Sequence, residues 1–282
     1  MTGRVGVLVH RDKPEAALLA KRATAWLSER GHEVWVPPDD AAAAGLEEWT
    51  WPDEQHAADL DLAVSLGGDG TMLRTVDLVC AGGVPVLGVN FGHLGYLTEC
   101  EPSDLEAALG RFFAGDFRIE ERMTLDVRTA GRYPGVLALN EAWLEKTLPG
   151  HTVRMSLSIA GAVFTTYAAD GLIVSTPTGS TAYNLSVRGP IVSPTLRAMV
   201  VKPVSPHQLF DYALVLDADE EVAVEVLEGR TATLLVDGQR VGELEPGDTV
   251  TCRGGPYPAR LVRFGAHDFH QILKAKFALA DR

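Results

Sequence analysis

The first part of the chain alternates between short apolar runs and longer segments in which apolar residues recur every three or four positions. Mostly apolar runs of this kind are typical of strands buried on both faces. They occur at Val5–Val9, Glu33–Val36, Leu60–Leu66 and Val84–Val89. Helices are indicated from Pro14 to near Gly31, over Met72–Cys80 and from Ser103 onward. Strand–helix alternation predicts an α/β domain with a parallel sheet and helices on both faces.

Two local patterns refine this expectation. Glu106 follows Ser103 at the spacing of a capping box, which predicts that the helix begins there. Pro37–Gln55 shows neither period, and we interpret it as an irregular excursion at the surface.

After residue 117 the period changes to two. The alternation is seen in Leu125–Thr129, Arg154–Ile159 and Glu221–Leu227, with turn signals such as Asp237-Gly238 between such segments. This pattern predicts an all-β domain.

The last segment returns to a helical period. Its apolar positions Phe269, Ile272, Leu273 and Phe277 share one face, so we expect a C-terminal helix that packs back on the first domain. The predicted organisation is therefore an α/β domain over residues 1–117, completed by a helix at 266–282, and an all-β domain over 118–265.

Composition narrows the classes of function. The chain has 282 residues, 46% of them hydrophobic, with a net charge of −13 and a pI near 5.0. We see no run of Lys and Arg that could form a basic face, so a nucleic-acid partner is not expected. No stretch approaches the roughly 20 apolar residues of a membrane span, and the N-terminus lacks a signal-peptide pattern. We therefore expect a cytoplasmic protein without a membrane partner.

The three cysteines, Cys80, Cys100 and Cys252, are far apart and do not have zinc-ligand spacing. We expect them to be reduced, small buried residues, and no metal-ligating residue is assigned.

The segment Gly67–Thr71, with the sequence GGDGT, follows a predicted buried strand and precedes a helix. Ligands of open α/β sheets bind at the carboxyl ends of the strands. Glycines let backbone N–H groups approach phosphate oxygens, and a helix N-terminus favours anions. A carboxylate at Asp69 suits a general base for a hydroxyl group or an indirect magnesium partner. The alternative is a tight turn in which Asp69 caps the helix.

Two further segments carry polar groups next to apolar runs. Asp170–Thr176 leads into Pro177–Tyr183, which offers several hydroxyl groups on a rigid turn and one aromatic ring for a base. Asn140-Glu141 follows an apolar run, and an amide beside a carboxylate can hold the two vicinal hydroxyls of a ribose. Taken singly, the first could be an ordinary loop and the second a solvated strand end.

In combination these segments resemble the NAD kinase family. The matching pieces are Gly67–Thr71, Asn90–Leu97, Asn140-Glu141, Asp170–Tyr183 and Gly189–Ile191, in the family's order and at compatible spacing. The resemblance implies an enzyme that phosphorylates the 2′-hydroxyl of the adenosine ribose of NAD to make NADP. It also implies ATP or another phosphate donor, a divalent cation such as Mg²⁺, and a homodimer or homotetramer.

The resemblance also implies roles for single residues. Asp69 would be the catalytic base, and Gly67, Gly68, Gly70 and Thr71 would bind phosphate. The substrate-binding residues would be Tyr96, Asn140, Glu141, Asp170, Thr181, Ala182, Tyr183, Ser186 and Gln239. Among them, Asn140 and Glu141 would hold the adenosine ribose and Asp170 would face the nicotinamide end.

Three positions depart from the family pattern. Ala168 stands where a basic or glycine residue is common, Arg188 adds bulk near Gly189, and Asp211–Ala213 lacks an arginine. These departures leave open a kinase of the same superfamily acting on a nucleoside-like substrate. A lipid kinase is a further alternative, because lipid kinases share the Gly-Gly-Asp-Gly loop and a similar two-domain plan. A non-catalytic dinucleotide-binding regulator is the remaining alternative.

Overall fold

The computed structural model describes residues 2–51, 54–91, 95–265 and 269–279. The chain forms two compact units. The first consists of Met1–Glu121 and Ala259–Arg282, and the second of Arg122–Pro258. Among the described residues, no helix is long and apolar enough to cross a membrane.

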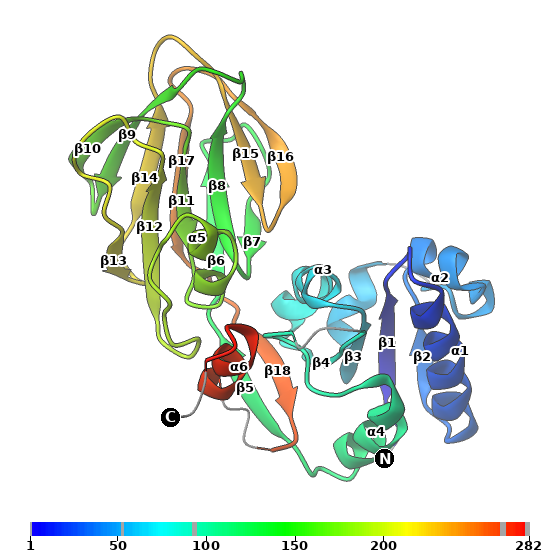
Figure 1. Ribbon diagram of the computed structural model, residues 1–282. Helices are drawn as coiled ribbons and strands as arrows, with labels where there is room; N and C mark the ends of the chain where they lie inside the picture. The colour runs from blue at the N-terminus through cyan, green and yellow to red at the C-terminus, as the bar shows by residue number, and fades with distance from the viewer. Residues whose placement is uncertain (1, 52–53, 92–94, 266–268, 280–282) are drawn as a thin grey trace. The chain divides into compact units, whose positions relative to one another are not determined.

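The first unit is built on a six-stranded sheet in the order β2-β1-β3-β4-β18-β5 (Figure 1). Its strands are β1 (Arg4–Val9), β2 (Glu33–Trp35), β3 (Leu62–Leu66), β4 (Pro85–Val89), β5 (Arg118–Arg122) and β18 (Ala259–Arg263). The pairs β1–β2, β1–β3, β3–β4 and β4–β18 are parallel. Because β3 is buried along its whole length, it reads as a continuous apolar run.

Helices cover both faces of this sheet. They are α1 (Pro14–Glu29), α2 (Pro38–Ala44), α3 (Asp69–Val79), α4 (Leu105–Phe113) and α6 (Phe269–Lys276), with 3-10 turns at Glu47–Trp49, Glu54–Asp59, Cys80–Gly82 and Pro102–Asp104. Helices α1 and α4 share one apolar cluster with alternate residues of β1, β3 and β4. On the other face Met72 of α3 lies against Gly88 of β4, where an added Cβ would be 2.6 Å from the methionine sulfur.

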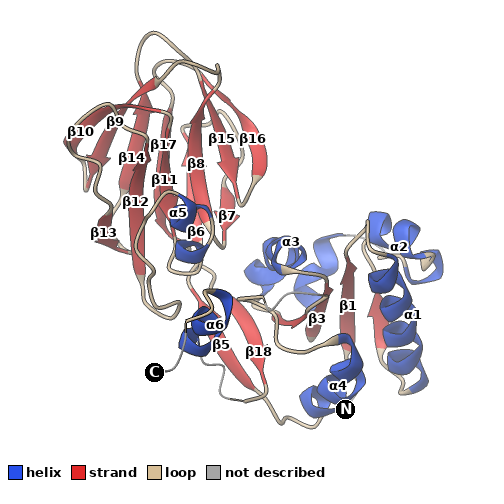
Figure 2. Ribbon diagram, in the orientation of Figure 1, coloured by secondary structure: helices blue, strands red, loops and turns tan. Residues whose placement is uncertain are grey.

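The second unit holds two antiparallel six-stranded sheets, coloured red in Figure 2. One has the order β10-β9-β14-β17-β6-β7: β6 (Leu125–Thr129), β7 (Val136–Ala138), β9 (Val153–Ile159), β10 (Ala162–Ala169), β14 (Val222–Val226), β17 (Thr249–Gly254). The other has the order β13-β12-β11-β8-β15-β16: β8 (Glu141–Lys146), β11 (Gly171–Ser175), β12 (Ala198–Val204), β13 (Leu214–Asp217), β15 (Ala232–Val236), β16 (Gln239–Leu244). A 3-10 turn, Gly179–Thr181, and the short helix α5 (Tyr183–Ser186) complete the unit.

The apolar faces of these two sheets form a single core. Leu157 and Cys252 of the first sheet and Leu144 and Leu172 of the second belong to one buried cluster. The inward positions alternate with polar outward ones, which produced the period of two in the sequence. The predicted fold class, an α/β domain followed by an all-β domain, is confirmed.

The C-terminal helix packs on the first unit as predicted. The ring of Phe269 lies 6.2 Å from that of Tyr96, and Ile272 is buried. Phe277 lies beyond the end of α6 and is exposed, so it does not belong to the apolar face of the helix as predicted.

The prediction of an irregular surface excursion over Pro37–Gln55 is wrong in part. The segment forms α2, and several of its own residues are buried. Asp40 is fully buried and accepts hydrogen bonds from the Val9 amide and the side chains of Arg11 and Arg74. A buried carboxylate held by two arginines is a long-range feature that local periodicity does not show.

Three boundaries also differ from the sequence expectation: the start of α4 and both ends of the second domain. Ser103 lies inside a 3-10 turn and α4 begins at Leu105, so the predicted capping box is wrong. Strands β5 and β18 join the sheet of the first unit, whereas the predicted second domain, 118–265, included both. An apolar run does not reveal which of two sheets it enters.

Candidate active site

The glycine-rich segment Gly67–Thr71 lies where β3 ends and α3 begins. The amide of Gly67 donates to the Val89 carbonyl at 3.2 Å, which ties the loop to the carboxyl end of β4. An added Cβ on Gly67 would lie 2.1 Å from the hydroxyl oxygen of Thr71, so the turn requires glycine there. Gly70 is exposed, and Thr71 is buried. The loop therefore offers backbone N–H groups at the first turn of an eleven-residue helix.

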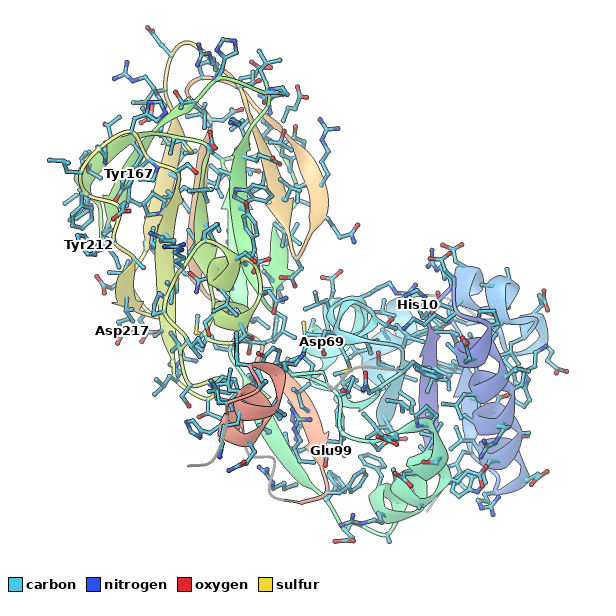
Figure 3. All side chains as sticks on the ribbon, viewed as in Figure 1. His10, Asp69, Glu99, Tyr167, Tyr212 and Asp217 are labelled. Carbon is cyan, nitrogen blue, oxygen red and sulfur yellow. The ribbon has the colours of Figure 1, made fainter. Side chains whose placement is uncertain are left out.

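Asp69 is the first residue of α3, and Gly68 occupies the N-cap position. Its carboxylate is hydrogen-bonded outside the helix: Oδ2 accepts from the Tyr96 amide and Oδ1 from the Leu97 amide, each at 3.2 Å. A carboxylate has about four acceptor positions. These two bonds orient it and leave capacity to accept a proton from a hydroxyl group. The label in Figure 3 marks this half-buried side chain.

The backbone at Gly95 lies very close to the Asp69 carboxylate. An added Cβ on Gly95 would lie 2.6 Å from Asp69 Oδ1, so only glycine permits this approach. Gly95 belongs to the Asn90–Leu97 motif, of which residues 92–94 lie outside the described residues.

Tyr96 presents its ring to the C-terminal helix. The ring is half-buried, 6.2 Å from Phe269, and Lys276 Nζ lies 4.4 Å from its centroid. Burial and, to a smaller extent, the charge of Asp69 raise the pKa of the Tyr96 hydroxyl. In this unit the structure thus brings together Asp69, the phosphate-binding candidates and Tyr96.

In the second unit, Asn140 and Glu141 are held by Asp237. The Asp237 carboxylate accepts hydrogen bonds from three consecutive amides, those of Leu139 and Asn140 at 2.7 Å and of Glu141 at 3.1 Å. Asp237 has a φ of 47° in the turn between β15 and β16, and Gln239, exposed, begins β16. In the sequence, Asp237 is marked only as part of the turn signal Asp237-Gly238.

Replacing Asp237 with Asn is expected to destabilise the protein by about 1–3 kcal/mol, because three charge-assisted bonds are weakened or lost. Urea denaturation measures the change. Asp219→Asn is the matched control, since Asp219 is an exposed turn residue, and its effect should be within about 0.5 kcal/mol. Equal effects of the two changes would contradict a clamping role for Asp237.

Glu141 is buried, with 8% of its surface exposed. Burial, then the charge of Asp237, raises the pKa of Glu141 to about 7, although a hydrogen bond from the Tyr183 amide opposes the shift. Among the described residues, Glu141 Oε2 has no hydrogen-bond partner. A buried polar atom of this kind requires explanation, and a ligand hydroxyl is a suitable partner.

Most hydroxyl groups of Pro177–Tyr183 are used inside the protein. Ser180 Oγ donates to the Pro177 carbonyl at 2.6 Å, and Thr181 Oγ1 donates to the Thr178 carbonyl at 3.2 Å. Just before this range, Thr176 Oγ1 donates to the Leu139 carbonyl at 2.6 Å. An added Cβ on Gly179 would lie 2.1 Å from the Asn140 carbonyl oxygen, so this turn and the Asn140 backbone are in close contact. The turn therefore fixes the position of Asn140.

The other predicted residues of this turn are more accessible. Thr181, Ala182 and Tyr183 are half-buried and Ser186 is exposed. The Tyr183 ring lies 4.4 Å from that of Trp143 on β8. Burial, followed by the charges of Glu145, Asp170 and Glu141, raises the pKa of Tyr183, so this ring lies in an acidic environment. Trp143 was missed by sequence reasoning because nothing in its local pattern marks it.

Asp170 lies beside Lys146, whose Nζ is 2.5 Å from Asp170 Oδ1. Lys146 ends β8 and Glu141 begins it, so these two residues are five positions apart along one strand, roughly 17 Å between their backbones. Lys146 was also missed, and it supplies a cation at Asp170, two residues after Ala168 in the sequence.

The other two departures lie in this unit as well. Arg188 is exposed and has a φ of 62°, a backbone conformation that favours glycine. The carbonyl of Asp211 accepts a hydrogen bond from Lys202 Nζ.

Metal ligands do not cluster in the described parts of the chain, where no group of three or more His, Cys, Asp or Glu side chains could hold an ion.

Comparison with known proteins gives a consistent result. The profile of the ATP-NAD kinase N-terminal domain matches residues 5–117, and that of the ATP-NAD kinase C-terminal domain matches 139–264. The NAD kinase of Heliobacterium modesticaldum is 43% identical over 277 residues, covering 96% of this chain and 97% of that protein. The NAD kinase of Moorella thermoacetica is 40% identical, covering 97% and 88%.

Solved structures agree in fold. An NAD kinase from Archaeoglobus fulgidus in complex with ATP has a TM-score of 0.76 at 25% identity, covering 99% of this chain and 100% of that one. Yeast NADH kinase complexed with NADH has a TM-score of 0.89 at 24% identity, covering 100% and 89%. Both family profiles and the near full-length relatives show that this chain belongs to the NAD kinase family.

Proposed function

We propose that the protein transfers the γ-phosphoryl group of ATP to the 2′-hydroxyl of the adenosine ribose of NAD. The observation that carries this proposal is the carboxylate of Asp69, oriented by two backbone amides in the phosphate-loop position of a family member. The hydroxyl proton passes to this carboxylate, the ribose oxygen bonds to the γ-phosphorus, and the bond from phosphorus to the departing ADP breaks. The products are NADP, ADP and a proton.

The loop around Asp69 would bind phosphate. Gly68 and Gly70 would direct backbone N–H groups at phosphate oxygens, aided by the positive end of α3. Gly67 and Thr71, whose amides donate to the Val89 and Gly68 carbonyls, would complete the phosphate-binding loop by fixing its shape. Because phosphoryl transfer depends mainly on positioning and charge neutralisation, such a loop contributes without covalent chemistry.

The second unit would recognise the dinucleotide. Asn140 and Glu141 would hold the ribose, with Glu141 Oε2 accepting from a ribose hydroxyl. Residues bordering the adenine would be Thr181, Ala182, Tyr183 and Ser186, with Tyr96 and Gln239 as further contacts. Asp170, paired with Lys146, would face the nicotinamide end.

A divalent cation such as Mg²⁺ fits these residues. Magnesium is commonly bound through one or two carboxylates plus substrate phosphates, and such a site does not require a dedicated cage of protein ligands. Asp69 is the carboxylate in the phosphate loop and would be its protein partner through water, which leaves the carboxylate able to accept the hydroxyl proton. When bound, the cation neutralises charge on the transferred phosphoryl group and on the departing ADP.

The acceptor is tested by a substrate panel. The protein is incubated with ATP and Mg²⁺ and, separately, with NAD, NADH, a nucleoside or diacylglycerol, and the phosphorylated products are identified by mass spectrometry. We expect NADP from NAD. Phosphorylated lipid or nucleoside alone would overturn the proposal in favour of another kinase of the superfamily, and binding of NAD without any product would indicate a regulator.

We also expect a homodimer or homotetramer in the cytoplasm, on the strength of the family resemblance. Light scattering coupled to gel filtration gives the mass to compare with 30.3 kDa for one chain.

A further inference from the structure

The first unit contains a buried arginine that the proposed chemistry does not use. Arg263, at the end of β18, has a fully buried side chain. Its Nη1 donates to the Leu97 carbonyl at 3.1 Å, to the Thr98 carbonyl at 3.3 Å and to Glu99 Oε2 at 3.1 Å. Nη2 and Nε donate to Glu120 Oε1 at 3.1 and 3.3 Å. The guanidinium is thus bonded on all sides within the protein.

Glu99 joins the segment Leu97–Glu99 to the end of β18 through both of its carboxylate oxygens. Its Oε1 accepts from the Phe264 amide at 2.7 Å while Oε2 pairs with Arg263. Glu99 is labelled in Figure 3 and is nearly buried, with 9% of its side chain exposed. The end of β18 and the segment Leu97–Glu99 are therefore joined by backbone and side-chain bonds, although 166 residues separate Leu97 from Arg263.

The same segment holds Asp69. The amide of Leu97 donates to Asp69 Oδ1, and the carbonyl of Leu97 accepts from Arg263. One residue therefore connects the buried guanidinium to the carboxylate. The preceding residue, Tyr96, provides the second amide to Asp69.

We propose that Arg263, with Glu99, is a positioning residue for Asp69: it fixes the segment whose amides orient the carboxylate. This inference rests on the proposed role of Asp69 in phosphoryl transfer. A displacement of about 1 Å in a reacting group can lower a rate by about 100-fold. A segment that holds the Asp69 carboxylate rigidly is therefore expected to have a large effect on kcat. Arg263 lies on β18, which follows the second unit in sequence, so the residue that fixes the Asp69-binding segment comes from the C-terminal part of the chain.

The structural part of the proposal is tested without activity. Hydrogen exchange of the Tyr96 and Leu97 amides is measured in the wild type, in Arg263→Lys and in Arg260→Lys. Lysine keeps the charge but cannot form the multiple bonds of the guanidinium. Arg260 is the matched control, because it lies on the same strand and donates to the Gly83 carbonyl at 2.6 Å. Exchange should be at least about tenfold faster in Arg263→Lys only; equal rates in all three proteins would overturn the proposal.

The functional part is tested by kinetics with ATP and the acceptor that the wild type phosphorylates. Arg263→Lys is expected to lower kcat by about tenfold to 100-fold while KM for the acceptor stays within about twofold. In the Asp69→Asn background the same change should have little further effect on kcat, because both act through one group. Full additivity, or a change confined to KM, would contradict the proposal. Glu99→Gln keeps an acceptor for the Phe264 amide and should lower kcat by a smaller factor. It replaces Arg263→Lys as the test variant if that protein folds poorly.

The two hypotheses fail in different ways. If the wild type does not phosphorylate NAD but Arg263→Lys accelerates amide exchange, the proposed substrate is wrong and the positioning role stands. If NAD is phosphorylated and Arg263→Lys changes neither exchange nor kcat, the positioning role is wrong.

Discussion

Replacing Asp69 with Asn is expected to lower kcat for NAD phosphorylation by about 10²–10⁴-fold, the usual contribution of general acid–base catalysis. The amide cannot accept the proton of the ribose hydroxyl. The dissociation constant for NAD should change by no more than about threefold, because the proposed ribose and adenine contacts come from other residues. Steady-state kinetics give kcat, and calorimetric titration gives the dissociation constant.

The matched control for this change is Asp77→Asn, on the same helix, which should keep kcat within about twofold. Melting temperatures of both variants separate lost catalysis from lost folding, since in Asp69→Asn the new side-chain amide nitrogen would face one of the backbone N–H donors. Turnover close to that of the wild type would mean that Asp69 is not the base.

Replacing Glu141 with Gln is expected to change how stability depends on pH. Burial raises the pKa of Glu141 to about 7 in the folded protein, against 4.5 for the ordinary group. Between these values the folded state holds a proton that the unfolded state has lost, so stability falls as pH rises. The loss reaches about 3 kcal/mol at pH 7 and above. A glutamine side chain does not titrate, so the variant should gain about 3 kcal/mol relative to the wild type between about pH 4.5 and pH 7.5.

Urea denaturation of both proteins over this pH range measures the difference, in which the contributions of all other groups cancel. Glu145→Gln, on the same strand, controls for the general effect of removing a carboxyl group. A difference between wild type and Glu141→Gln that is independent of pH would show that Glu141 does not titrate as described.

The features that the sequence predicted best are local ones. The segment Gly67–Thr71 combines a buried strand, three glycines and a helix start within a few residues, and each of these is readable from neighbours in the chain. The same holds for the alternation that separates the α/β unit from the β unit. Pro37–Gln55 was misjudged because the burial of Asp40 depends on Arg11 and Arg74, which are distant in sequence.

The residues that hold the candidate site in place could not be predicted either, because their contacts are with residues distant in sequence. Asp237 holds the Asn140 amide across 97 residues, and in sequence it is indistinguishable from an ordinary turn residue. Lys146 and Trp143 acquire their positions from the pairing of β8 with β11 and from the fold of the Pro177–Tyr183 turn. Arg263 looks like the polar end of a strand until its five hydrogen bonds are seen.

The central claim is that the acceptor is the 2′-hydroxyl of the adenosine ribose of NAD. Its most direct test compares NAD with an analogue that lacks only this hydroxyl, the 2′-deoxyadenosine form, each incubated with ATP and Mg²⁺. Phosphorus NMR of the products locates the new phosphate. We predict a 2′-phosphomonoester from NAD and no phosphorylated product from the analogue. Phosphorylation of the analogue, or a phosphate at any other position of NAD, would contradict the account.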